Sequence, residues 1–339
     1  MLPPEPLLRV ENLKTHFRTG RGLVRAVDGV SFSLEQGVAL GLVGESGCGK
    51  TILSRTLMGL LPPSAWVPAS ARIHFNDREL RSLPEPELRA VRGRELAMVF
   101  QDPMTSLNPV MTVGAQIGES LTRHLGSSRR AAKARAVELL NAVGIPSPAR
   151  RVEEYPHQLS GGIRQRVAIA IALSCEPKLL IADEPTTALD VTVQAGILDL
   201  LQREQHERNM ALILITHDLG VVAGRTDRIA VMYAGRIVEV ADTRSLFAHT
   251  RMPYTRALID SVPRLSAPPH SRLRTISGQP PDLTGPSSGC RFAPRCDRSR
   301  ERCESERPDL EPVGDGGHLA VCWHPLALEE VGASGGPPS

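Results

Sequence analysis

The 339-residue sequence is poor in aromatic side chains, because Phe, Trp and Tyr together make up only 3% of it. A surface that stacks the bases of single-stranded nucleic acid needs aromatic rings, so the composition argues against such a surface. Lysine is also scarce, since only 4 of the 40 basic residues are lysines, and the formal net charge is +3. So small a net charge does not by itself indicate a nucleic-acid partner.

Long apolar runs are missing as well. The longest, Val167–Leu173 and Ala211–Ile215, are much shorter than the roughly 18 residues that a membrane-spanning helix needs. Met1–Pro6 is acidic and interrupted by prolines, so we expect no secretory signal there. Six cysteines without an export signal argue against a disulfide framework. We therefore expect a globular protein. If it acts at a membrane, we expect it to lie on the membrane surface and not to cross it.

Short apolar runs rich in β-branched residues alternate with segments of helical periodicity. We predict strands at Leu8–Val10, Val30–Leu34, Val38–Val43, Leu179–Ala182, Ala211–Ile215, Ile229–Tyr233 and Arg236–Val240. We predict helices at Thr51–Leu61, 130–142 and Val193–Glu207. This alternation predicts an α/β fold with a largely parallel sheet. Residues 102–158 interrupt the alternation and look helical, which predicts an inserted helical subdomain.

The composition of the sequence changes near residue 251. Residues 262–339 hold 12 of the 28 prolines, about twice their share, so this part is not rich in helices. We predict one domain over residues 1–250, a loop-rich extension over 251–339 and a disordered tail from about residue 332.

A glycine-rich motif follows the predicted strand 38–43. It reads Gly-Glu-Ser-Gly-Cys-Gly-Lys-Thr over Gly44–Thr51 and matches the phosphate-binding pattern G-x-x-x-x-G-K-[ST] at every position. Glycines allow a tight turn, so that backbone N–H groups and the start of the next helix point at phosphates. Lys50 is expected to reach the β- and γ-phosphates, and the Thr51 hydroxyl to bind Mg²⁺. These residues predict a P-loop nucleotide-binding fold.

Two carboxylates support this prediction. The apolar run that begins at Leu179 ends in Asp183 and Glu184. A strand that delivers Asp183 to its C-terminal end suits a water-mediated contact with Mg²⁺. Glu184 lies one residue further, where a general base can polarise the attacking water.

Further motifs carry a family resemblance. Residues Leu159–Arg166 read Leu-Ser-Gly-Gly-Ile-Arg-Gln-Arg and resemble the signature motif of ATP-binding cassette (ABC) proteins, and they precede Asp183 as in that family. Gln101 resembles the family's glutamine loop, Ala188–Asp190 its D-loop and His217 its switch histidine. Six motifs stand in the family's order over residues 8–240.

The resemblance implies a role for each motif. ATP bound to the phosphate loop of one subunit meets the signature of a second subunit, so dimerisation completes the active site. Gln101 senses Mg²⁺ and the water, while His217 holds the γ-phosphate and Glu184 in line. The aromatic ring of Phe17 aligns with the one that stacks on adenine. The predicted nucleotide-binding residues are Phe17, Gly44, Glu45, Ser46, Gly47, Cys48, Gly49, Lys50, Thr51 and Ile52. The predicted catalytic residues are Lys50, Gln101, Glu184 and His217, and the predicted Mg²⁺ ligands are Thr51, Gln101 and Asp183. The signature residues that act across the dimer are Ser160, Gly161, Gly162 and Gln165, and the D-loop residue is Asp190.

Three longer segments, 101–109, 183–194 and 252–263, resemble the ATPase subunits of bacterial oligopeptide, dipeptide and nickel importers. The resemblance implies an ATP-hydrolysing subunit at the cytoplasmic face of the membrane, bound to two permease subunits and to a second, paralogous ATPase subunit. An extracytoplasmic binding protein acts with it, and residues 102–122 are expected to receive a permease helix. The cargo is most simply a dipeptide or oligopeptide, with nickel as the alternative.

A soluble ABC ATPase acting on nucleic acid or ribosomes is a rival from another class. Such proteins usually have two cassettes in one chain or a long coiled-coil insertion, and this sequence has one signature, one phosphate loop and no sustained heptads. We therefore expect no nucleic-acid partner.

Four of the cysteines lie within 33 residues of the extension, in the pattern Cys290-x₅-Cys296-x₆-Cys303-x₁₈-Cys322. Structural zinc sites usually have shorter C-x₂₋₄-C spacings, whereas iron–sulfur clusters accept wider ones. Some importer ATPases that this chain resembles carry a [4Fe–4S] cluster on a matching pattern. We therefore expect a [4Fe–4S] cluster here, with zinc as the runner-up and unrelated buried thiols as the third alternative. Arg291, Arg295 and Arg298 are expected to offset the charge of the cluster.

Overall fold

The computed structural model describes residues 5–102, 106–187, 189–262, 275–285, 288–314 and 316–327. The chain divides into two compact units that alternate along the sequence. The first unit comprises Met1–Leu7, Glu35–Val38 and Ser82–Ile215, and the second comprises Leu8–Leu34, Ala39–Arg81 and Thr216–Ser339.

An antiparallel sheet in the second unit is built on a long hairpin. Strands β1 (Leu8–Thr19) and β2 (Gly22–Leu34) pair antiparallel, and β1 continues the sheet on its other side. Buried and exposed side chains alternate along much of β1, so one face of the hairpin packs on the core. The other strands of this sheet are β4 (Ala65–Trp66), β5 (Arg72–Phe75) and β6 (Arg78–Glu79).

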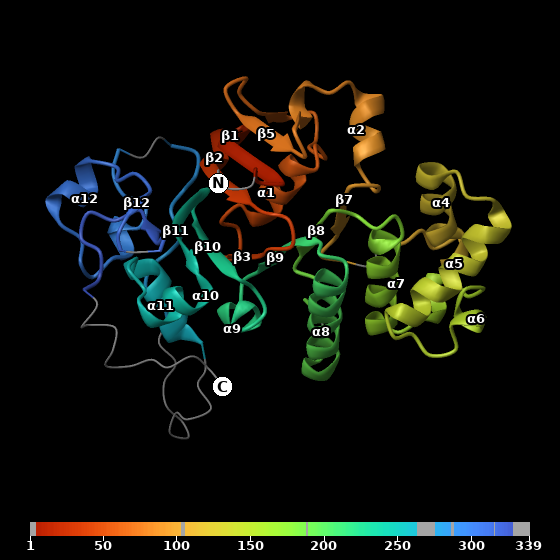
Figure 1. Ribbon diagram of the computed structural model, residues 1–339. Helices are drawn as coiled ribbons and strands as arrows, with labels where there is room; N and C mark the ends of the chain where they lie inside the picture. Colours follow the sequence, from red (N-terminus) through yellow and green to blue (C-terminus); the bar gives the residue numbers. More distant parts are fainter. Residues whose placement is uncertain are drawn as a thin grey trace. The chain divides into compact units, whose positions relative to one another are not determined.

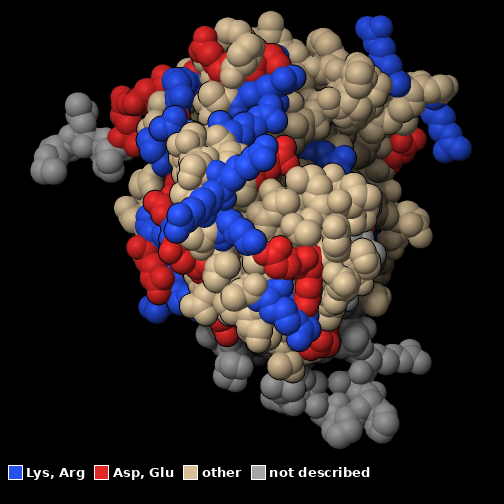
Figure 2. Space-filling model, turned by 90° about the vertical axis from the view of Figure 1, so that its right-hand side faces the viewer, with Lys and Arg blue, Asp and Glu red and all other residues tan. Residues whose placement is uncertain are grey.

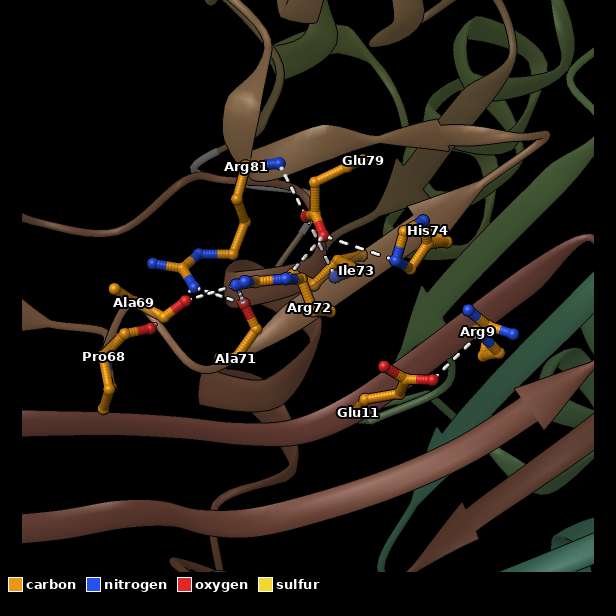
Figure 3. A network of polar contacts seen from close by, with 10 residues as sticks. All are labelled: Arg9, Glu11, Pro68, Ala69, Ala71, Arg72, Ile73, His74, Glu79 and Arg81. Atoms are coloured by element: carbon orange, nitrogen blue, oxygen red, sulfur yellow. Dashed lines mark hydrogen bonds and ion pairs between the residues drawn. The ribbon is translucent and has the colours of Figure 1, made fainter.

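Polar contacts hold the β5–β6 hairpin and the loop before it (Figure 3). One carboxylate oxygen of Glu79 accepts hydrogen bonds from the backbone N–H groups of Ile73 (3.1 Å) and Arg81 (3.2 Å). The Arg81 guanidinium donates to the carbonyl oxygens of Pro68 (2.7 Å) and Ala71 (2.6 Å). These contacts fix a loop that has little regular secondary structure of its own.

A second set of strands in the same unit surrounds the phosphate loop. The apolar strand β3 (Ala39–Val43) is fully buried and pairs parallel with β10 (Arg228–Tyr233). Strand β11 (Arg236–Asp242) pairs antiparallel with β10. The extension adds β13 (Leu319–Ala320), which pairs with β11, and β12 (Glu311–Pro312), which pairs with β13. The helices of this unit are α1 (Lys50–Leu57), α9 (Leu219–Val222), α10 (Thr243–Ala248), α11 (Pro253–Ser261) and α12 (Glu301–Ser305), with the 3₁₀ turn η3 (Ala293–Arg295).

The first unit contains three parallel strands, β7 (Leu96–Val99), β8 (Leu179–Asp183) and β9 (Ala211–Thr216). All their residues are buried, as expected for a parallel sheet covered on both faces. The helices that accompany these strands are α2 (Glu85–Val91), α7 (Gly161–Leu173) and α8 (Val191–Glu207). The 3₁₀ turn η2 (Pro156–Gln158) also belongs to this unit, and the turn η1 (Leu80–Ser82) lies where the chain passes from the second unit to the first.

A helical group in the first unit follows β7 and is drawn in yellow in Figure 1. It consists of α4 (Val113–Leu125), α5 (Arg129–Ala142) and α6 (Pro148–Arg151). The sequence marks two of these helices clearly, since the hydroxyl of Thr112 accepts from Ala115 N–H and that of Ser128 from Ala131 N–H. Helices α4–α6 thus lie within residues 102–158, and the bounds of the predicted insert stay a prediction.

The structure confirms the α/β fold. Strand β1 extends to Thr19, much further than the predicted Leu8–Val10, because pairing with β2 stabilises a polar stretch that is not apolar enough to be recognised alone. No helix among the described residues is both long and apolar enough to cross a membrane. The predicted tail from residue 332 lies outside the described residues, and the predicted division at residue 250 stays a prediction.

Candidate nucleotide-binding site

The phosphate loop lies in the second unit, between β3 and α1. Two of its glycines have no room for a side chain: a Cβ atom on Gly44 would lie 2.1 Å from the carbonyl oxygen of Met232, and one on Gly49 would lie 2.2 Å from that of Ala26. Gly49 also has φ +111°, which disfavours other residues. Around Gly47 the space is open. The loop is therefore a tight backbone turn with an open side.

Lys50 begins α1 and is 4% exposed. Its ammonium group donates to the carbonyl oxygens of Gly44 (2.8 Å) and Glu45 (3.1 Å), so the side chain folds back over the loop. The residue that caps α1 is Gly49, which offers no side chain to the helix start. A helix N-terminus and a buried ammonium group in one loop suit a polyphosphate. Thr51 follows directly and supplies the hydroxyl predicted to bind Mg²⁺.

Cys48 occupies the interior side of the loop. It is buried, and burial raises the pKa of its thiol above the ordinary value, so the side chain is neutral. Its backbone carbonyl accepts from the N–H of Gly235 (2.7 Å), in the turn between β10 and β11. Ser46 and Gly47, by contrast, are exposed.

The first unit contains the predicted carboxylates. Asp183 ends β8 and is 1% exposed. The next residue, Glu184, has φ +46°, and its N–H donates to the carbonyl of Ile215 at 3.0 Å. One carboxylate oxygen of Glu184 accepts from Gln101 Nε2 (3.1 Å) and from Thr187 Oγ1 (2.9 Å). The structure thus joins the predicted base to the predicted glutamine, and it adds Thr187, which the sequence analysis missed.

The signature residues lie at the start of α7 in the first unit. Ser160 and Gly161 are exposed, and the Ser160 hydroxyl makes no capping bond to its own helix. A Cβ atom on Gly162 would lie 2.7 Å from Val193 Cγ1, so a glycine lets α7 approach α8 here. Gln165 differs from these three, because it is 1% exposed and faces the interior.

The remaining predicted residues lie in different surroundings. Asp190 caps α8 by accepting a hydrogen bond from Val193 N–H at 2.9 Å. His217 is exposed and directly follows β9, while Phe17 is half-buried on β1. Ala188, in the predicted D-loop, lies outside the described residues.

The predicted motifs are divided between the two units: the phosphate loop, Phe17 and His217 belong to the second, and Gln101, Asp183, Glu184, Asp190 and the signature belong to the first. The residues fit ATP with Mg²⁺. The helix start and Lys50 suit phosphates, and hydroxyl and carboxylate oxygens are the ligand types that Mg²⁺ prefers.

The predicted iron–sulfur cluster is wrong. Among the described residues, which include all four cysteines, no group of three or more His, Cys, Asp or Glu side chains is placed to hold a metal ion. This finding also leaves the zinc alternative without support. The cysteines of the predicted set, Cys290, Cys296, Cys303 and Cys322, line a cavity of about 20 Å³, which is about the space of one water.

Cys303 is buried, and the other three cysteines of the set are half-buried. Burial raises the pKa of Cys290, Cys296 and Cys322 above the ordinary value, for Cys322 to about 11. Two of the arginines that were expected to balance a cluster pair elsewhere: Arg291 with Asp28, and Arg295 with Glu45.

Comparisons with known proteins agree with the site geometry. The family model "ABC transporter" matches residues 27–187, and "Oligopeptide/dipeptide transporter, C-terminal region" matches residues 238–303. Among solved structures, the dimeric bacterial ABC transporter cassette MJ0796 superposes with a TM-score of 0.63 at 27% identity, over 70% of this chain and 99% of that one. CbiO1 of Clostridium perfringens superposes with a TM-score of 0.60 at 29% identity, over 72% of this chain and 92% of that one. The fold and the site therefore define an ABC-type P-loop ATPase.

Curated relatives are more similar still. The dipeptide transport ATP-binding protein DppD of Bacillus subtilis is 49% identical over 94% of this chain and 95% of its own length. The oligopeptide transport ATP-binding protein OppD of the same species is 49% identical over 95% of this chain and 90% of its own length. The chain belongs to the family of ABC transporter ATP-binding proteins. It is an ATPase subunit of a transporter, and it binds ATP and Mg²⁺.

Proposed function

We propose that this chain is the ATP-hydrolysing, energy-coupling subunit of an importer for dipeptides or oligopeptides, located peripherally at the cytoplasmic face of the cell membrane. The observation that carries the proposal is the presence, in one chain, of the ATPase motifs and of a C-terminal region like that of oligopeptide/dipeptide transporters. DppD and OppD, similar over almost the whole chain, are named for dipeptide and oligopeptide transport. Nickel remains the alternative cargo.

In this proposal the phosphate loop binds the triphosphate. Lys50 and the start of α1 hold its phosphates, while Thr51, Asp183 and Gln101 hold Mg²⁺ directly or through water. The Mg²⁺ ion supplies positive charge that offsets the charge of the phosphates during transfer. Phe17 stacks on the adenine.

Hydrolysis is assigned to the carboxylate after β8. Glu184 accepts a proton from the attacking water, and its hydrogen bonds from Gln101 and Thr187 orient its carboxylate. His217 aligns the γ-phosphate with that carboxylate. Asp190 and the signature residues Ser160, Gly161 and Gly162 serve the ATP of a second subunit, for which the exposed start of α7 is suited. Gln165, being buried, acts by supporting α7.

The proposed partners are two permease subunits, a second and paralogous ATPase subunit, and, indirectly, an extracytoplasmic binding protein. We assign permease docking to the helical group. A hollow of about 800 Å³ lies there between α4, α5 and residues 152–153. It is lined by residues of the predicted docking segment 102–122, of which Pro103–Thr105 lie outside the described residues. Filling the hollow with Ala115→Trp should uncouple ATP hydrolysis from transport, whereas Ala134→Trp, exposed on α5 outside the hollow, should not.

The charges of the helical group favour this proposal over a nucleic-acid role. Figure 2 shows Lys and Arg close to Asp and Glu on this side of the molecule. Lys133 forms an ion pair with Glu153 (2.5 Å), and Arg151 with Glu154 (2.6 Å). A nucleic-acid surface instead gathers cations that face phosphates without acidic partners.

The test compares what stimulates ATP hydrolysis by the purified chain. Vesicles that contain the permeases of a peptide importer, with a peptide-loaded binding protein, should raise the rate. RNA and DNA should leave the rate unchanged. Stimulation by nucleic acid, and none by the permeases, would overturn the proposal.

A further inference from the structure

The C-terminal extension contacts the phosphate loop through one ion pair. The guanidinium of Arg295, in η3, donates two hydrogen bonds to the carboxylate of Glu45, the second residue of the loop, at 2.7 and 2.9 Å. The Arg295 side chain is 4% exposed and that of Glu45 is 24% exposed. Both residues belong to the second unit, although 250 positions separate them in the sequence. A bidentate pair of this kind fixes both position and orientation.

The surroundings of Arg295 hold its guanidinium in place. Its Nε donates to the carbonyl of Ser277 at 2.9 Å, and the Tyr233 hydroxyl lies 3.3 Å from Nη1. The guanidinium carbon lies 5.8 Å from the centre of the Tyr233 ring. The hydrogen bonds with Glu45 raise the pKa of Arg295 further above its ordinary value, so the side chain is always charged.

A second contact reaches the backbone of the same loop residue. The N–H of Glu45 donates to the hydroxyl of Tyr254, in α11, at 3.0 Å. Tyr254 packs against Tyr233 and Phe292, with ring centres 4.4 and 5.3 Å away. Glu45 is thus held at its side chain and at its N–H by residues that come after position 250.

Arg291 provides a third, indirect connection to the loop. It forms an ion pair with Asp28 (2.7 Å) and donates to the carbonyl of Ala234. The next residue, Gly235, donates to the carbonyl of Cys48 in the phosphate loop at 2.7 Å. Two arginines four positions apart in the extension therefore hold the two flanks of the loop, one directly and one through the β10–β11 turn.

We propose that the extension is part of the nucleotide site, and that Arg295 is a positioning residue that neutralises Glu45 and orients the loop for the triphosphate. The inference rests on the proposed function, because it requires the loop Gly44–Ile52 to bind ATP. Its physical basis is charge: a carboxylate in a phosphate-binding loop repels a polyphosphate unless a cation balances it. Arg295 has no contact with ATP in this role and acts through Glu45.

The test uses the full chain and measures ATP affinity by isothermal titration, together with kcat and KM. Arg295→Gln should weaken ATP binding by about 10- to 100-fold, the range for loss of a charge-assisted contact. The value of kcat at saturating ATP should change by less than about threefold, because the hydrolytic residues are untouched. Arg302→Gln is the matched control. Arg302 lies in the same extension, over the Trp323 ring and paired with Glu306, and its loss should leave ATP affinity unchanged.

A double variant tests whether Arg295 positions the loop through Glu45 or only stabilises the fold in general. Removing both charges in Glu45→Gln/Arg295→Gln should restore affinity to within about threefold of Glu45→Gln alone, since the repulsion is gone. If Arg295→Gln does not fold, the double variant and Arg295→Lys provide the test; Arg295→Lys keeps the charge but not the two-point contact, so it should bind ATP more weakly than the wild type.

Two results would overturn the inference: ATP affinity unchanged in Arg295→Gln, or a double variant as weak as Arg295→Gln. Lys50→Ala distinguishes this failure from a failure of the proposed function. If Lys50→Ala loses ATP while Arg295→Gln keeps it, only the inference fails. If neither change affects ATP binding, the assignment of the phosphate loop itself is wrong.

Discussion

Replacing Glu184 by glutamine tests the hydrolytic mechanism at one atom. In the structure the hydrogen bonds that Gln101 (3.1 Å) and Thr187 (2.9 Å) donate to this side chain end on the same carboxylate oxygen. A glutamine can keep its carbonyl oxygen in that place and accept both bonds. What it loses is the basic carboxylate, because an amide does not accept a proton from water at neutral pH.

The expected effect is therefore on the chemical step alone. Loss of a general base lowers kcat by about 10²–10⁴-fold, which corresponds to about 2.7–5.4 kcal/mol in the activation barrier. ATP affinity should stay within a few fold, and a closed, ATP-bound dimer should accumulate. Phosphate release under saturating ATP measures the rate, and isothermal titration measures the affinity.

Thr187→Val is the matched control for Glu184→Gln. It removes the hydrogen bond from Thr187 to that oxygen and leaves the base, so kcat should fall by only about 3- to 10-fold. A wild-type rate in Glu184→Gln would refute the assignment of the base. An equal loss of rate in both variants would show that orientation, and not basicity, is what Glu184 contributes.

Three further changes probe the phosphate loop and its support. Lys50→Ala should weaken ATP binding by more than about 10-fold, measured by titration, because it removes the ammonium group from the phosphate site. Gly49→Ala should lower the free energy of unfolding by about 1–3 kcal/mol from backbone strain alone, with a further loss from the clash with Ala26, and urea unfolding measures both. Thr15→Val should cost about 0.5–1.5 kcal/mol in the same assay, because it removes the 2.8 Å hydrogen bond between two buried hydroxyls while Thr56 keeps its bond to the Ile52 carbonyl (2.6 Å); no change would show that the bond between the hydroxyls does not stabilise the fold.

The local parts of the site could be predicted from sequence because their chemistry depends on spacing along the chain. The phosphate loop needs glycines at fixed intervals before a lysine, and a helix start needs a capping residue, as at Thr112 and Ser128. Such patterns occupy a few consecutive residues. Asp183 was predictable for the same reason, since it ends an apolar strand.

The contacts that sequence could not predict join distant positions. No local pattern indicates that Arg295 reaches Glu45, because the ion pair depends on how the extension packs on β10 and α11. Thr187 was missed although it stands only three residues after Glu184, because its role depends on the left-handed backbone at Glu184.

The cysteine prediction failed for a related reason. Spacing along the chain does not distinguish thiols that converge on a metal from thiols that pack beside apolar side chains. In the structure the cavity that the four cysteines line is also lined by Phe292 and Trp323, and burial favours the protonated thiol at Cys322. Arg291 and Arg295, which were expected to offset the charge of a cluster, instead form ion pairs with Asp28 and Glu45.

Uptake of a labelled dipeptide by sealed vesicles tests the central claim most directly. The vesicles contain the chain with the proposed partners, a second ATPase subunit and two permeases, together with ATP on the side of the ATPase subunits and a binding protein with the labelled dipeptide on the other side. The account predicts uptake that requires ATP and that stops with Glu184→Gln, although the variant still binds ATP. Uptake that continues without ATP, or at an unchanged rate in Glu184→Gln, would contradict it.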